Sequence, residues 1–240
     1  MDFARHKRET RAVRAGVRET VGYERTRKQR GDANWPYYTA DARHYFSPDN
    51  WQHADDFVEA FPHALNEIKH LFQSDMSGKG AYIDFCGAAS GASLGARKSY
   101  AVTLDAPHKN KPFLQDITIG SLLERRTLHE LFKKVRADGS KFLAGTIVPI
   151  GGFEHYLKKG GMTPIMKVLE ERYARAIAYI ASQLEPGGVL YVEYLFSGVV
   201  SQFNQELFER YVLSKAKGVT FEWEYTKLSR SAVKIQKQRL

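Results

Sequence analysis

The chain has 240 residues, of which 43% are hydrophobic, and 36 Lys and Arg against 27 Asp and Glu give it a net charge of +9. This length favours one large domain, and no apolar run reaches the roughly 18 residues needed to span a bilayer. The basic N-terminus is not followed by the apolar segment of a secretory signal. A single cysteine, Cys86, excludes an internal disulfide framework and a Cys-based zinc cluster. We therefore expect an intracellular, reducing compartment and no membrane association.

Positive charge is concentrated at the two ends of the sequence. Residues 1–30 hold ten Lys or Arg against four Asp or Glu, and residues 214–240 hold seven against two. Such ends predict contact with a polyanion, here RNA, although they could simply keep the chain soluble. We predict a basic, mobile arm over residues 1–30. The candidate RNA-binding residues are Arg5, Lys7, Arg8, Arg11, Arg14, Arg27, Lys28, Arg30, Lys158, Lys159 and Arg230.

Residues 31–60 form an extension rich in aromatic side chains. These aromatics could stack on bases beside the Arg and His of the same segment, or they could cover the edge of the core, which is the interpretation that we favour. They are Trp35, Tyr37, Tyr38, Tyr45, Phe46 and Trp51.

From Phe61 onward, the hydrophobic pattern alternates between strands and helices. Apolar spacings of three and four predict helices near 61–72, 122–135, 166–184 and 203–211, and short apolar runs predict strands at 81–85, 100–105, 142–150 and 189–196. Residues 220–226 and 231–237 read as a closing antiparallel hairpin. We therefore predict one α/β domain over residues 61–240, with a mostly parallel sheet and helices on both faces.

The segment from Ala81 to Gly95 carries the most informative functional signal. A buried strand ends at Asp84 and meets a turn of small residues, which would let a ligand approach the backbone closely. The next strand ends at Asp105, whose carboxylate could accept hydrogen bonds from ribose hydroxyls, and Asp116 with Ile117 could contact an adenine. We expect all three elements at the carboxyl ends of parallel strands. The spacing matches neither the dinucleotide pattern G-x-G-x-x-G nor a phosphate loop.

Three motifs resemble those of the FtsJ-like ribose 2′-O-methyltransferases. The run D-F-C-G-A-A-S-G at 84–91 is similar to their first motif, D-L-G-A-A-P-G-G. The run L-E-P-G-G-V-L-Y-V-E at 184–193 resembles L-x-P-G-G-x-x-x-V-K, and S-R-S-A-V-K-I at 229–235 resembles their final S-x-E-V-Y strand. The resemblance implies a Rossmann-like methyltransferase fold and S-adenosylmethionine (SAM) as cofactor. The residues it implies around SAM are Asp84, Gly87, Ala88, Ser90 and Gly91 at the methionine end, Asp105 at the ribose, and Asp116 and Ile117 at the adenine.

The catalytic tetrad of that family, Lys-Asp-Lys-Glu, is largely missing. Lys69 could match the first Lys, although it could equally be an exposed helix charge. Thr146 stands where the Asp belongs, Glu193 where the central Lys belongs, and Ala232 where the Glu belongs. We therefore do not expect ribose methylation by the usual route.

Two hypotheses remain for the function. The first is a SAM-dependent RNA methyltransferase with altered chemistry, for example on a base nitrogen that Glu193 orients. The second is a catalytically inactive protein that binds RNA or other proteins in a ribonucleoprotein or viral RNA-processing complex. The eight histidines show no metal-ligand spacing, so we predict no metal site.

Overall fold

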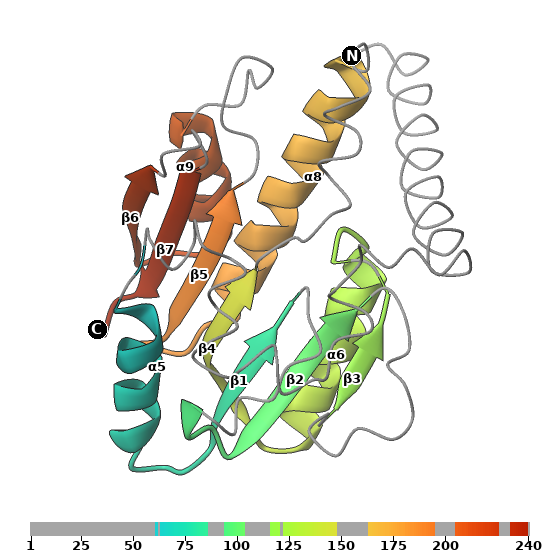
Figure 1. Ribbon diagram of the computed structural model, residues 1–240. Coiled ribbons are helices and arrows are strands. Elements are labelled where there is room, and N and C mark those ends of the chain that lie inside the picture. Colours follow the sequence, from blue (N-terminus) through green and yellow to red (C-terminus); the bar gives the residue numbers. More distant parts are fainter. Residues whose placement is uncertain are drawn as a thin grey trace, which may run out of the picture.

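The computed structural model describes residues 61, 63–85, 94–103, 116–120, 122–147, 163–194, 205–225 and 231–239, and the basic arm and the aromatic extension lie outside these residues (Figure 1). The elements agree with the predicted alternation of strands and helices. The helices are α5 (Ala64–Gln73), α6 (Arg125–Ala137), α8 (Thr163–Ser182) and α9 (Gln205–Leu213). The strands are β1 (Gly80–Asp84), β2 (Lys98–Thr103), β3 (Ile117–Ile119), β4 (Lys141–Ile147), β5 (Val189–Tyr194), β6 (Val219–Tyr225) and β7 (Ser231–Lys237).

The strands form one seven-stranded sheet in the order β3-β2-β1-β4-β5-β7-β6. Pairings among β1 to β5 are parallel, whereas β7 is antiparallel to both β5 and β6. The last strand of the chain therefore inserts between β5 and β6 (Figure 1). This arrangement confirms the predicted Rossmann-like α/β fold with a mostly parallel sheet and a C-terminal antiparallel hairpin.

Strand β3 was not predicted from the sequence. It has only three residues, Ile117–Ile119, and pairs with β2 from Ala101 to Thr103. A three-residue strand is too short for a period of two to be recognised. The pairing with β2 is what makes it a strand.

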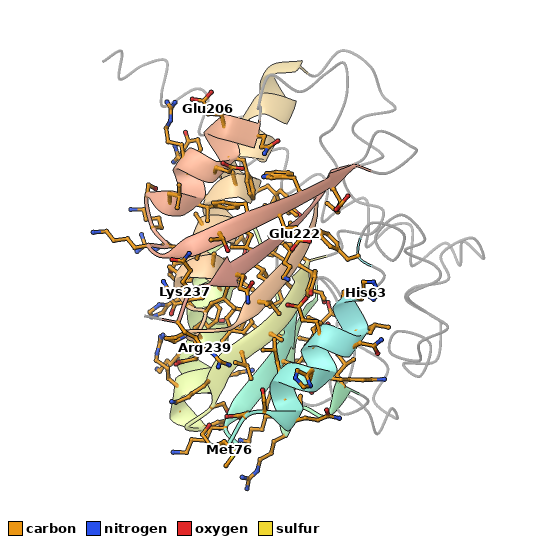
Figure 2. All side chains as sticks on the ribbon, turned by 90° about the vertical axis from the view of Figure 1, so that its left-hand side faces the viewer. His63, Met76, Glu206, Glu222, Lys237 and Arg239 are labelled. Atoms are coloured by element: carbon orange, nitrogen blue, oxygen red, sulfur yellow. The ribbon has the colours of Figure 1, made fainter. Side chains whose placement is uncertain are left out.

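The two faces of the sheet are covered differently. Side chains from α6, α8 and α9 pack with Ile83, Phe85 and Phe142 in the larger core cluster, whereas Ile68 of α5 belongs to a second cluster on the opposite face. Figure 2 shows His63, just before α5, and Glu206, in α9, on opposite sides of the sheet. The predicted placement of helices on both faces is confirmed for the described elements.

Helix α5 illustrates why these elements form where they do. Ala64, Ile68 and Phe72 recur every four residues and are all buried, so the helix presents one apolar stripe to the sheet. Strand β1, by contrast, is buried at all five positions, as expected for a central parallel strand covered on both faces. Among the described residues, no helix is both long enough and apolar enough to cross a membrane.

Candidate functional site

The strand order places a topological switch point between β1 and β4. Strands β2 and β3 follow β1 on one side, and the chain then crosses to place β4 and β5 on the other side. In open α/β sheets, ligands bind outside the carboxyl ends of the strands at such a point. The residues that end β1 and β4 are therefore the first candidates for a site.

Asp84 is the last residue of β1 and lies directly at this switch point. It pairs in register with Thr146 of β4, and the Phe85 amide donates to the Thr146 carbonyl at 3.0 Å. Only 6% of Asp84 is exposed. Burying a carboxylate costs free energy, which nearby polar or cationic groups must offset. Asp84 thus stands at the edge of the sheet where a ligand would bind, and its position there makes it a candidate contact.

A buried tyrosine hydroxyl lies near this carboxylate. The Tyr82 Oη and Thr146 Oγ1 atoms are 2.6 Å apart and form a buried hydrogen bond. Burial raises the pKa of Tyr82 well above its usual range, and the nearby charge of Asp84 raises it further. The phenol therefore stays protonated, and Thr146 is engaged inside the sheet rather than turned to a ligand.

The structure corrects the expected place of Asp116. This residue precedes β3, so it lies at the amino end of that strand and not at its carboxyl end. Its carbonyl accepts from the amide of Ala101, and its charge contributes to the raised pKa of Tyr100. The Tyr100 side chain is buried in the core on the α6 side of the sheet, whereas Asp84 shares the α5 face with Tyr82. The two acids therefore lie on different strands, with Asp84 on the α5 face and Asp116 acting on a tyrosine of the α6 face. Contact of Asp116 with an adenine stays a prediction.

Ile117 lies closer to the candidate site than Asp116 does. Ile117 pairs with Ala101, which pairs in turn with Asp84, so one row of the sheet joins the three residues. Its side chain is half-buried. Contact of Ile117 with an adenine stays a prediction.

The four positions aligned with the catalytic tetrad lie on α5, β4, β5 and β7. Lys69 is half-buried on α5, and Glu193 pairs in register with Ala232 near the carboxyl end of β5. Thr146 is 4% exposed and Ala232 is fully buried. Neither has a carboxylate, so these two positions cannot supply the acidic members of the tetrad.

Sequence reasoning missed a charged cluster on the α5 face, formed by Glu67, Tyr191, Glu222 and Lys234. We call it the Lys234 cluster. Lys234 Nζ lies 2.8 Å from Glu67 Oε1 and 3.4 Å from Glu222 Oε2, and the Tyr191 hydroxyl donates to Glu67. Tyr191 and Lys234 pair in register across β5 and β7, and Glu222 continues the row on β6. Figure 2 shows Glu222 on this hairpin.

The Tyr191 hydroxyl and the Lys234 ammonium both keep their protons more strongly than usual. Burial raises the pKa of Tyr191, and its hydrogen bond to Glu67 raises it further. Burial alone would lower the pKa of Lys234, but the bonds to Glu67 and Glu222 outweigh it and the pKa is raised. Neither group can give up a proton near neutral pH, so the cluster joins α5 to the sheet rather than serving as a base.

Part of this cluster could have been found in the sequence. The hairpin register that pairs Tyr225 with Ser231 also pairs Glu222 with Lys234, and opposite charges on facing strand positions are a common stabilising pair. Glu67 lies 124 residues from Tyr191 in the sequence. Its place in the cluster depends on how α5 packs, which no local pattern reports.

The remaining predicted site residues fall outside the described part of the chain. This is the case for the turn and ribose candidates Gly87, Ala88, Ser90, Gly91 and Asp105. It is also the case for the RNA-binding candidates Arg5, Lys7, Arg8, Arg11, Arg14, Arg27, Lys28, Arg30, Lys158, Lys159 and Arg230.

Comparison with known proteins gives similarity at the level of structure only. No protein-family model and no curated protein matches the sequence. Among solved structures, magnesium protoporphyrin IX methyltransferase from Synechocystis PCC 6803 with bound SAM is 11% identical, with a TM-score of 0.40, over 85% of this chain and 94% of that one. An rRNA methylase from Streptococcus thermophilus is 13% identical, with a TM-score of 0.33, over 75% and 97% of the two chains.

A third similar structure is a protein from Streptococcus mutans assigned as a SAM-dependent methyltransferase. It is 11% identical with a TM-score of 0.37, and the match covers 72% of this chain but only 48% of that one, so this chain spans about half of its length. Similarity at this level adds no argument about the site. The fold and the candidate site therefore rest on the strand order and the residues described above.

Proposed function

We propose that this protein binds SAM at the carboxyl edge of its sheet and transfers the methyl group to RNA. The observation that carries the proposal is the buried carboxylate of Asp84 at the end of β1, beside the switch point with β4. The motif similar to the first methyltransferase motif begins at this same residue. Topology and motif thus indicate the same place independently, which supports a cofactor site there.

The chemistry of Asp84 fits SAM better than a nucleotide phosphate. SAM has a positively charged amino group, for which a buried carboxylate is a suitable acceptor, whereas a phosphate would be repelled. The small residues that follow in the sequence leave room for a ligand against the backbone. When bound, SAM supplies an electrophilic methyl group carried on a positively charged sulfur.

The residues at the tetrad positions favour a base nitrogen over a ribose hydroxyl as the acceptor. A hydroxyl must lose its proton, but Thr146 and Ala232 provide no carboxylate for this task. A ring nitrogen already has a free electron pair, so holding it in place beside the methyl group is sufficient. We assign the orienting role to Glu193, whose carboxylate can accept from the exocyclic amino group of a base.

RNA is the proposed acceptor because of the charge distribution. The two basic ends supply cations for backbone phosphates, and the charge of +9 is available to attract a polyanion. Phosphate contacts of this kind hold a strand without reading its sequence. The base that is methylated is then selected at the edge of the sheet.

Calorimetric titration with SAM tests the cofactor site. We expect Asp84→Asn to weaken SAM binding by about tenfold or more, since a charge-assisted hydrogen bond is lost. The matched control is Asp138→Asn, which removes the same charge from an exposed residue at the opposite, amino edge of the sheet, where Asp138 pairs with Lys98 at the start of β2. No binding of SAM by the unaltered protein would contradict the proposal, and so would an equal loss in both variants.

Transfer of a labelled methyl group from SAM to RNA tests the reaction. We expect Glu193→Ala to abolish transfer while SAM affinity stays unchanged, because Glu193 is assigned to the acceptor and not to the cofactor. Full transfer by this variant would refute the assigned role of Glu193. Digestion of the product to nucleosides then distinguishes base methylation from ribose methylation.

A second candidate function is an inactive RNA-binding or assembly protein that keeps the fold. The specific observation in its favour concerns two of the tetrad positions. The Thr146 hydroxyl is hydrogen-bonded to Tyr82 inside the sheet, and Ala232 is fully buried. Binding of SAM and RNA without methyl transfer would establish this second function in place of the first.

A further inference from the structure

We infer that the exposed face of α6 is a docking surface for the phosphate backbone of RNA. This surface was not among the RNA-binding residues predicted from the sequence. The inference rests on the RNA target of the proposed function but does not require that SAM is bound or that a methyl group is transferred. The exposed side chains of α6 are Arg125, Arg126, His129, Glu130, Lys133, Lys134, Arg136 and Ala137.

Cations outnumber carboxylates on this face within the described part of the chain, although Glu124 and Asp138 at the two ends of α6 act on Arg126 and Lys134. Five of the exposed residues are Lys or Arg, against the single carboxylate of Glu130, which pairs with Arg126 at 2.8 Å. Lys134 donates to the Ile117 carbonyl and Arg136 to the Gln183 side chain, and neither acceptor has a charge. The surface therefore keeps an excess of cations, which favours a polyanionic partner.

The charge at the first turn of α6 is opposite to what an isolated helix prefers. The amino end of a helix favours acids, but the first turn of α6 has none and instead begins with Arg125 and Arg126. The residue before the helix, Glu124, makes no capping hydrogen bond through its side chain. The exposed Glu124 carboxylate accepts from the Thr127 hydroxyl at 3.5 Å and its charge acts on Arg126, so an anion here would meet two arginines with one carboxylate beside them.

The position of α6 connects this surface to the candidate site. Strand β3 is parallel to β2 and ends at Ile119, so α6 begins near the same sheet edge at which β1 ends in Asp84. The helix rises about 1.5 Å per residue, which puts Arg125 about 16 Å from Arg136 along the axis. A strand of RNA could thus lie along α6 with one end near the ligand edge.

The test uses the full chain and a fluorescein-labelled single-stranded oligouridylate, with binding measured by fluorescence anisotropy over a range of salt concentrations. The variant is Arg125→Gln with Arg126→Gln and Lys133→Gln. The matched control is Lys79→Gln with Arg97→Gln and Arg210→Gln, which removes the same charge from three exposed residues and also includes one arginine, Arg210, that pairs with a glutamate four residues away.

We expect the α6 variant to lose about tenfold in RNA affinity at low salt, and its salt dependence to fall by about 2 in slope, since each phosphate contact on a single strand contributes about 0.7. The control should change the slope by less than half as much. Equal effects of the two variants would overturn the inference, because net charge alone would then explain binding, and so would an unaffected α6 variant.

Two further outcomes are decisive. If labelled polyglutamate binds and the α6 variant weakens that binding more than RNA binding, the surface fits an acidic protein and the inference is wrong. SAM titration of the same α6 variant separates the two proposals, because its SAM affinity should equal that of the unaltered protein. A protein that binds RNA through α6 but does not bind SAM would uphold this inference and refute the proposed enzyme.

Discussion

At the scale of single residues, location decides what two otherwise similar acids can do. Asp84 ends the central strand β1 and is almost fully buried, whereas Asp116 is exposed and precedes an edge strand. The two predicted cofactor contacts would therefore differ in kind, since Asp84 would meet a ligand from inside the sheet and Asp116 from its surface.

The hydrogen bond between Tyr82 and Thr146 gives a prediction at this scale. Thr146→Val keeps the shape of the side chain and removes the hydroxyl, so we expect the free energy of unfolding to fall by about 1 kcal/mol. Tyr82→Phe should cost a similar amount. Because the two hydroxyls bond each other, the double variant should lose less than the sum. Urea unfolding measures all three, and strict additivity would show that the two groups do not interact.

At the scale of elements, the Lys234 cluster explains how α5 is held against the sheet. The helix contributes an apolar stripe and one acid, Glu67, which reaches Tyr191 on β5 and Lys234 on β7. The resemblance to the ribose methyltransferases assigns catalytic residues to α5, β5 and β7 as well. Here Tyr191 and Lys234 lie two residues further from the ligand edge than the aligned positions on β5 and β7, and both bind Glu67 of α5 in place of a substrate.

Lys234→Met gives a prediction at the scale of elements. The Lys234 side chain is 15% exposed and that of Glu67 is 31% exposed, so we expect a loss of about 1–2 kcal/mol in the free energy of unfolding, less than for a fully buried pair. The pKa of Lys234 is raised in the folded protein. Its contribution is therefore present below its ordinary pKa of 10.5 and is lost as the pH rises above that value.

Chemical unfolding at several pH values measures this effect. The difference in stability between the unaltered protein and Lys234→Met should stay constant from neutral pH to about pH 10 and shrink at higher pH. Arg210→Met is a suitable comparison, since the Arg210 pair with Glu206 is exposed on both sides and should contribute little. A difference that grows with rising pH would contradict the role assigned to Lys234.

At the scale of the whole molecule, the fold places the candidate cofactor site and the amino end of α6 near one edge of the sheet. Five strands run in parallel, so their carboxyl ends gather, and the helix that follows β3 begins at the same edge. A ligand at the switch point would bind the folded state and not the unfolded chain, because β1 and β4 are distant in sequence and come together only in the folded sheet. Binding there should therefore stabilise the whole domain.

Thermal unfolding in the presence of SAM tests this coupling. At a SAM concentration 100 times the dissociation constant, we expect about 2.7 kcal/mol of stabilisation, which for a chain of this size raises Tm by about 5–10 °C. Asp84→Asn at the same SAM concentration should show about half of this rise or less, since a tenfold weaker affinity leaves about 1.4 kcal/mol, and Asp138→Asn should show the full rise. A SAM-independent Tm in the unaltered protein would indicate that the folded state does not bind SAM.

The sequence by itself determined the class of fold and one candidate site. Local periodicity is enough to specify most helices and strands, since each buries one stripe or one run. The acid at the end of β1 can be recognised because a run of small residues follows it in the sequence. The tertiary structure decided which residues meet. The three-residue strand β3, its start after Asp116, and the meeting of Glu67 with Tyr191 and Lys234 all depend on pairing and packing between distant segments, and no local pattern specifies such contacts.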